Sequence, residues 1–188
     1  MIAKQYKNML NGKSVIRTLS EFATERGKEI GYENVFDYSL GNPSVPVPQD
    51  FTDVMIKMLQ EKNPMELHGY SPSLGIASVK AKIAQSLEER FGVPYKPENI
   101  FPTSGAAAAI AHAVRCVTEP WDEVLTFAPY FPEYGPYINL SGAVLKVVPA
   151  NTETFQINFE AFEEMLTDKV MAVLVNTPNN PSGVVYSE

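Results

Sequence analysis

Three short segments of the chain combine residue types that could bind an anionic, planar ligand. The first, 103–109, reads Thr-Ser-Gly-Ala-Ala-Ala-Ala, a small-residue turn directly before an alanine-rich helical stretch. Free N–H groups and the positive dipole end at a helix start attract anions, and glycine lets a phosphate approach the backbone. The Ser104 hydroxyl could add a contact. The competing interpretation is a capped, tightly packed helix start, and neither common glycine-rich nucleotide fingerprint occurs.

The second and third segments each follow an expected strand. Segment 128–134 reads Ala-Pro-Tyr-Phe-Pro-Glu-Tyr, so an aromatic ring could stack on a planar cofactor or, alternatively, plug the core. Segment 176–183 reads Asn-Thr-Pro-Asn-Asn-Pro-Ser-Gly and is a strongly constrained turn. An asparagine held there could donate its amide N–H to a ligand oxygen. An ordinary proline- and glycine-containing loop is the alternative.

The elements that would position these segments alternate between strand and helix from about residue 98. Apolar patterns predict strands at 99–103, 123–128, 143–149 and 170–176, and helices at 105–117, 131–140 and 159–166. This order predicts an α/β fold with a largely parallel sheet, whose carboxyl-terminal loops build the site. Further upstream, residues 1–35 show weak helical patterning. One helix is expected to begin at Asp50 as its N-cap. Another is expected to follow 73–75 and to run to about Phe91, with an irregular link at 63–73 between the two.

Composition narrows the class of protein. The chain has 188 residues with a net charge of -7, so it lacks the basic balance that non-specific nucleic-acid binding needs. No apolar run approaches the roughly 20 residues that span a bilayer, and the polar N-terminal sequence does not resemble a signal peptide. The single Cys116 cannot form an internal disulfide, which suits a reducing cytoplasm. We therefore expect no nucleic-acid partner, no membrane and a cytoplasmic location.

The constrained turn carries a family resemblance. Asn-Pro-Ser-Gly at 180–183 resembles the N-P-[TS]-G motif of fold-type-I pyridoxal-phosphate-dependent aminotransferases of class I/II, the aspartate aminotransferase-like enzymes. The other two segments stand in the family's order, as do Leu-Gly-Asn-Pro at 40–43 and Gly-Tyr-Ser-Pro-Ser-Leu-Gly at 69–75. The resemblance implies an N-terminal arm and small-domain segment at 1–48. It also implies part of a three-layer α/β/α large domain with a mostly parallel sheet at 49–188.

The resemblance implies a cofactor, pyridoxal 5'-phosphate, and residues that bind it. Ser104, Gly105 and Ala106 match the turn that holds the phosphate, although many members carry a polar side chain where this chain has Ala106. Phe131 matches the aromatic that stacks on the pyridine ring; Tyr130 takes that place if the match slips by one residue. Asn180 matches the asparagine that hydrogen-bonds the phenolic oxygen of the cofactor.

Two further matches involve the substrate and a second subunit. Tyr70 matches a tyrosine that reaches the phosphate of the other subunit, which implies a homodimer. Gly41 matches a glycine whose backbone lies near the substrate carboxylate, so it is the expected substrate-binding residue. By the same analogy, the Ala128–Pro129 and Asn180–Pro181 bonds are expected to be cis.

The implied activity is transfer of an amino group between an amino acid and a 2-oxo acid. A carbon–sulfur lyase of the same fold is the alternative, as is a non-catalytic remnant or partner-binding domain. The family places the lysine that carries the cofactor beyond position 188, so no catalytic residue is named here. The lysines at 80, 82, 146 and 169 are interpreted as surface charges. The strand expected at 99–103 would lack a neighbour, leaving an open edge and apolar surface.

Overall fold

The computed structural model describes residues 2, 7, 14–41, 43 and 45–187. Its internal contacts divide the chain into two compact units, Met1–Gly69 and Tyr70–Glu188. The sequence-based boundary between 48 and 49 refers to the domains of the family and stays a prediction.

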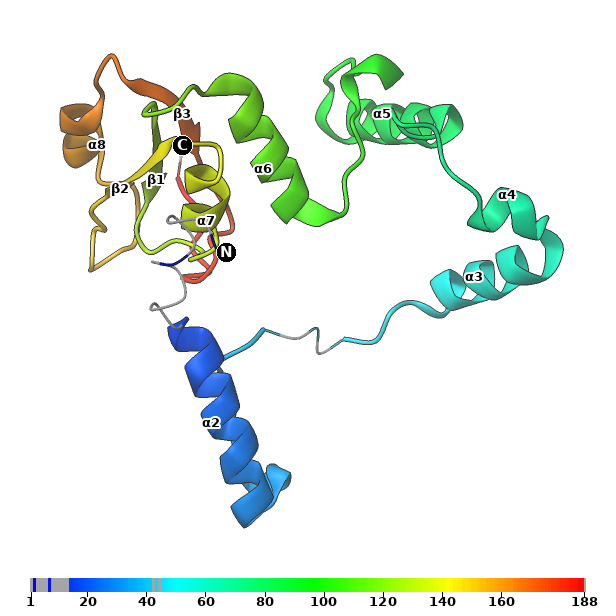
Figure 1. Ribbon diagram of the computed structural model, residues 1–188, viewed down its shortest axis with the longest axis horizontal. Coiled ribbons are helices and arrows are strands. Elements are labelled where there is room, and N and C mark those ends of the chain that lie inside the picture. Colours follow the sequence, from blue (N-terminus) through cyan, green and yellow to red (C-terminus); the bar gives the residue numbers. More distant parts are fainter. Residues whose placement is uncertain (1, 3–6, 8–13, 42, 44, 188) are drawn as a thin grey trace. The chain divides into compact units, whose positions relative to one another are not determined.

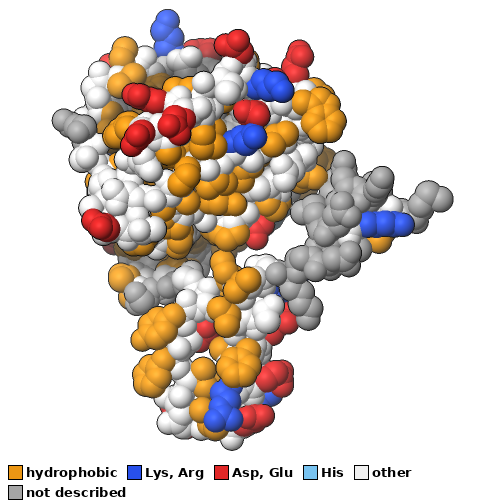
Figure 2. Space-filling view, turned by 90° about the vertical axis from the view of Figure 1, so that its left-hand side faces the viewer, with side chains coloured by type: hydrophobic (Ala, Val, Ile, Leu, Met, Phe, Trp, Pro, Cys, Tyr) orange, Lys and Arg blue, Asp and Glu red, His pale blue; other side chains and the backbone are white. Residues whose placement is uncertain are grey.

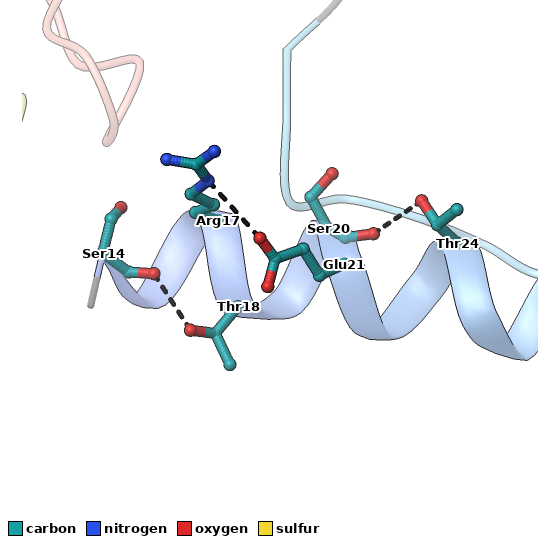
Figure 3. Close-up of polar contacts among 6 residues, drawn as sticks. All are labelled: Ser14, Arg17, Thr18, Ser20, Glu21 and Thr24. Atoms are coloured by element: carbon teal, nitrogen blue, oxygen red, sulfur yellow. Dashed lines mark hydrogen bonds and ion pairs between the residues drawn. The ribbon is translucent and has the colours of Figure 1, made fainter.

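The first unit begins with helix α2 (Val15–Ile30), followed by the short 3-10 helix η1 (Tyr32–Asn34). The polar side chains of α2 bond within the helix, as Figure 3 shows. The hydroxyls of Thr18 and Thr24 donate to the carbonyl oxygens four residues earlier, at 3.2 and 2.9 Å. Arg17 pairs with Glu21 at 3.4 Å. The helix therefore satisfies these groups without a tertiary partner.

Two more helices of this unit lie within the described residues. The N-cap of helix α3 (Gln49–Glu61) is Pro48 and not the predicted Asp50, which lies in the first turn of the helix. Helix α4 (Pro64–His68) occupies part of the link that was expected to be irregular. The side chain of Asn63 accepts the N–H of Met65 at 2.9 Å and so caps α4. A five-residue helix is too short to show a 3.6-residue period, which is why the apolar pattern missed it.

Helix α5 (Ala77–Phe91) and the 3-10 helix η2 (Pro97–Asn99) open the second unit. Helix α5 ends where the sequence predicts, because Gly92 adopts the left-handed conformation (φ 69°) that glycine tolerates. The strand predicted at 99–103 is wrong. Ile100 is extended, but over the described residues no strand pairs with this segment, and Phe101 is 58% exposed. An extended backbone without a ladder partner is not a strand.

Three parallel strands form the sheet of the second unit: β1 (Glu123–Phe127), β2 (Val144–Val148) and β3 (Val170–Leu174). Their order is β2-β1-β3, with β1 in the centre (Figure 1). Thr126 also donates its hydroxyl to the Leu174 carbonyl at 3.0 Å, which adds a side-chain bond to the β1–β3 ladder. The parallel α/β sheet expected from the alternating sequence pattern is confirmed.

Helices cover both faces of this sheet (Figure 1). Helix α6 (Gly105–Val117) and helix α7 (Tyr134–Asn139) pack on one face, where Val114, Val124 and Ile138 belong to one buried cluster. Helix α8 (Phe159–Met165) lies on the other face, where Phe162 contacts Phe127 with ring centroids 5.4 Å apart. Two helical layers around a parallel sheet form the partial three-layer α/β/α arrangement.

Large apolar side chains also remain on the surface, and Figure 2 shows them in orange among the charged groups. On α2, Val15 and Phe22 are 72% and 67% exposed. On the edge strand β3, Met171 and Val173 are 52% and 41% exposed. The expected exposure of apolar surface in segment 99–103 is thus confirmed at Phe101, while the exposed apolar side chains of β3 were not predicted.

Candidate functional site

The turn before α6 has the backbone shape that the glycine predicts. Gly105 has φ +83°, a conformation that a side chain would strain, while a Cβ built on it would meet nothing within 4 Å. Its N–H donates to the Thr103 carbonyl at 3.0 Å, and the Thr103 hydroxyl donates back to the Gly105 carbonyl at 3.0 Å. The turn therefore requires glycine because of its positive φ, and not because a side chain would collide with a neighbour.

The start of α6 is open to an incoming anion. Ser104, Gly105 and Ala106 are all exposed, and the Ser104 side chain does not cap the helix. In the described chain, the N–H of Ala106 has no acceptor outside the helix. Free N–H groups at the positive end of a helix dipole are the donors that a phosphate accepts. The alternative of a capped, tightly packed helix start is not what the structure contains.

The aromatic segment lies at the carboxyl end of β1. Phe131 is half-buried and meets Tyr134 edge to face, with ring centroids 5.7 Å apart. Tyr130 is also half-buried and stacks on Tyr134 at 6.4 Å. Tyr134 itself is 7% exposed, and this burial raises the pKa of its phenol. Tyr134 thus supports both rings that the sequence offers for cofactor stacking.

Two neighbouring asparagines follow β3 and differ in environment. Asn180, the predicted cofactor ligand, is exposed, and its side chain forms no hydrogen bond with any described residue. Its backbone N–H donates to the side-chain oxygen of Asn176 at 2.9 Å. The amide of Asn180 therefore keeps its full hydrogen-bonding capacity for a ligand.

Asn179 is the residue that sequence reasoning missed. It is 6% exposed, and its side chain accepts from the Ser182 N–H and hydroxyl at 3.1 and 2.8 Å. The same amide donates to the Tyr186 hydroxyl at 3.2 Å. The only available signal was the pair of adjacent asparagines, and composition alone does not tell which of the two turns inward.

The elements beside the phosphate turn, the aromatic segment and the asparagine loop pack against one core. Ile110 of α6, Phe131 and Leu174 at the end of β3 all pack against the buried cluster around Val124. Because β1 and β3 are parallel, the loops that follow them leave the same edge of the sheet. The expected cis bonds at Ala128–Pro129 and Asn180–Pro181 are confirmed, and Thr177–Pro178 is cis as well.

Gly41 belongs to the first unit, and Tyr70 is the first residue of the second unit but is not among the residues packed on this core. The Tyr70 side chain is fully exposed, at 109% of its reference area. Gly41 is exposed too, and a Cβ added to it would meet nothing within 4 Å. Its neighbour Asn42, part of the same sequence motif, lies outside the described residues. Both expected roles stay predictions.

The lysines of the described residues lie outside these segments. Lys82, Lys146 and Lys169 are exposed as predicted, and Lys146 pairs with Glu123 at 3.5 Å. Lys80 is half-buried, because its aliphatic chain passes close to Gly75. Over the described residues, no three His, Cys, Asp or Glu side chains gather as a metal ion would require. Within that same part of the chain, no helix has both the length and the apolar character to cross a membrane.

Comparisons with known proteins match this geometry to a family. The family model for aminotransferase class I and II matches residues 33–188. An aspartate aminotransferase of Thermotoga maritima is 34% identical over 82% of this chain and 40% of its own length. A probable aspartate/prephenate aminotransferase of Aquifex aeolicus is 32% identical over 88% and 42%.

Comparison with solved structures leads to the same family. A crystal structure of an aminotransferase from Eubacterium rectale superposes with a TM-score of 0.93 at 41% identity, covering 100% of this chain and 48% of that one. The chain thus spans less than half the length of these relatives.

Proposed function

Because the chain belongs to the class I and II aminotransferases, we propose that it contributes to pyridoxal-phosphate-dependent transfer of an amino group between an amino acid and a 2-oxo acid. The observation that carries the proposal is the exposed start of α6, where a positive-φ glycine and the free N–H of Ala106 follow an extended segment. The donor set suits a phosphorylated cofactor, since these backbone donors match its phosphate.

The described residues also suit the rest of the cofactor. Ser104, Gly105 and Ala106 would hold the phosphate, and the half-buried ring of Phe131 would lie against the pyridine ring. The free amide of Asn180 would donate to the phenolic oxygen and so tune the electronics of the ring. Bound pyridoxal phosphate supplies an electron sink for the substrate carbanion.

The remaining roles concern the substrate and assembly. Gly41 would offer its backbone to the substrate carboxylate, because an exposed glycine lets a carboxylate approach closely. The fully exposed Tyr70 would reach the phosphate of a second subunit in a homodimer. In this proposal the domain boundary lies between 48 and 49, and the protein works in the cytoplasm.

The choice of substrate stays open, because the relatives bear names of both aspartate and aspartate/prephenate aminotransferases. A carbon–sulfur lyase would use the same cofactor-binding residues. The names of the relatives favour amino-group transfer over elimination.

Phosphorus NMR of pyridoxal phosphate titrated with the full chain tests the cofactor proposal, and binding of pyridoxal, which carries no phosphorus, is measured by its ability to displace pyridoxal phosphate. Pyridoxal phosphate should bind, and pyridoxal without phosphate should bind at least about tenfold more weakly, since the charged hydrogen bonds at α6 are lost. Ala106→Asp should abolish binding by placing a carboxylate at the phosphate position. Ala113→Asp, on an exposed position of the same helix, is the matched control and should bind normally. Equal binding of pyridoxal and pyridoxal phosphate would refute the proposal.

A further inference from the structure

The loop that follows β3 is organised around one buried side chain. Asn179 uses its amide oxygen for the Ser182 N–H and hydroxyl, and its amide nitrogen for the Tyr186 hydroxyl. Its backbone N–H donates to the Val184 carbonyl at 2.8 Å, and its carbonyl accepts the Gly183 N–H at 2.7 Å. Five hydrogen bonds from one residue that is 6% exposed fix the course of segment 179–186.

This loop is tied to the sheet through the ring of Tyr186. The ring meets Phe127 edge to face, with centroids 6.3 Å apart, and Phe127 is a buried residue at the end of the central strand β1. The Tyr186 N–H also donates to the Thr177 hydroxyl at 3.2 Å. Asn179 is therefore connected to the sheet through a hydrogen bond and an aromatic contact.

Asn180 is held between this network and the end of β3. Its N–H is bonded to Asn176 on one side, and its preceding residue is the buried Asn179. The Asn180 side chain alone projects without a partner among the described residues. A donor held in place before the ligand arrives loses little entropy on binding.

We propose that Asn179, with Tyr186 as its partner, is the positioning residue that directs the Asn180 amide toward the phenolic oxygen of the cofactor. This inference rests on the proposed function, because the role of Asn180 is part of it. Asn179 does not touch the ligand; it acts through the backbone that it shares with Asn180. If Asn179 had a purely structural role, it would support the sheet edge, and the position of the Asn180 amide would not depend on it.

The test compares three variants of the full chain by NMR. Asn179→Ala removes the side-chain network, and Tyr186→Phe removes one acceptor while its ring still packs on Phe127. Gln156→Ala is the matched control, since its amide bonds to the Val185 carbonyl and the Ser187 N–H without contacting Asn179. The first readout is hydrogen exchange of the Asn180 backbone N–H, expected to become about tenfold faster in the first two variants only.

The second readout is affinity for two probes. Pyridoxal phosphate should bind about tenfold more weakly to Asn179→Ala, while inorganic phosphate, which probes only the start of α6, should bind unchanged. The double variant Asn179→Ala/Asn180→Ala should bind pyridoxal phosphate no more weakly than Asn180→Ala alone, because both act through one contact.

Two results would overturn the inference. One is unchanged exchange at Asn180 in Asn179→Ala; the other is an equal loss of phosphate and pyridoxal phosphate affinity, which would mark a general loss of structure. A wild-type chain that binds pyridoxal phosphate no more tightly than phosphate would contradict the proposed function instead. In that case the exchange rate at Asn180 still decides whether Asn179 fixes the loop.

Discussion

Asn179 and Asn180 are adjacent in the chain, yet the first is 6% exposed with every side-chain polar atom bonded, and the second is exposed and free. Their replacement by alanine should therefore separate stability from binding. Asn179→Ala should lower the free energy of unfolding by about 2–3 kcal/mol, because it removes the acceptor of the Ser182 N–H and hydroxyl and the donor to the Tyr186 hydroxyl. Asn180→Ala should stay within about 0.5 kcal/mol of wild type. Urea denaturation followed by circular dichroism measures both, and a similar loss in the two variants would contradict the assignment.

The central strand should be the most sensitive part of the core. Leu125 is completely buried in β1, so Leu125→Ala should destabilise the chain by about 2–5 kcal/mol through lost packing and the cavity left behind. Val173→Ala on the edge strand, where the side chain is 41% exposed, should cost less than about 1 kcal/mol. Chemical denaturation of the two variants checks the difference. Equal costs would mean that β1 is not central to the folded sheet in solution.

A side chain at Gly105 should destabilise the turn because the backbone φ at this position is positive. Gly105→Ala should cost about 1–2 kcal/mol because φ is +83°, although the added Cβ has room. It should also weaken binding of inorganic phosphate, measured by phosphorus NMR. The control is Gly135→Ala in helix α7, where an added Cβ meets only Leu145 at 3.9 Å. That control should leave stability unchanged or slightly raised, since alanine favours helix.

The phenols of Tyr134 and Tyr186 should lose their protons at a higher pH than an ordinary tyrosine. Burial raises the pKa of both Tyr134 and Tyr186 above the ordinary value of about 10, and the Asn179 hydrogen bond opposes the rise at Tyr186 only in part. Because the folded chain favours the protonated phenols, their contribution to stability is complete below about pH 10 and is lost as the pH rises through the folded pKa values.

Ultraviolet titration of tyrosinate absorbance measures this effect. The native chain should show a late component that Tyr134→Phe and Tyr186→Phe each reduce. The urea-unfolded chain serves as the control, and its tyrosines should titrate together near the ordinary value. A native titration curve that matches the unfolded one would rule out the burial of both phenols.

Turn residues, a helix-ending glycine and apolar runs in the sequence were sufficient to predict the bounds of the elements that they determine directly. Helix α6 runs from Gly105 to Val117, the range that the turn and the alanine pattern predict. Helix α5 ends at Phe91 because Gly92 terminates it through its left-handed backbone. The apolar runs also located β1, β2 and β3 to within one or two residues, since each strand is a short and mostly apolar run of residues.

Features that depend on distant partners could not be predicted. Ile100 and Phe101 have strand-like residue types, but strand formation needs a neighbour, and residue type does not supply one. The short helix α4 depends on a single cap from Asn63, which leaves no periodic pattern. At the site, the contrast between Asn179 and Asn180 arises from Tyr186, whose position against Phe127 comes from tertiary packing.

The position of β1 between its two neighbours also bears on the order of events during synthesis. A ribosome completes β1 before β2 and β3. The hydrogen bond from the Thr126 hydroxyl cannot form until the Leu174 carbonyl, 48 residues later in the chain, has been synthesised. Until then one side of the most buried strand has no ladder partner, so the nascent chain presents an unpaired edge. A chaperone that binds extended apolar segments would find its best target in this interval, and pausing translation between β2 and β3 should prolong its occupancy.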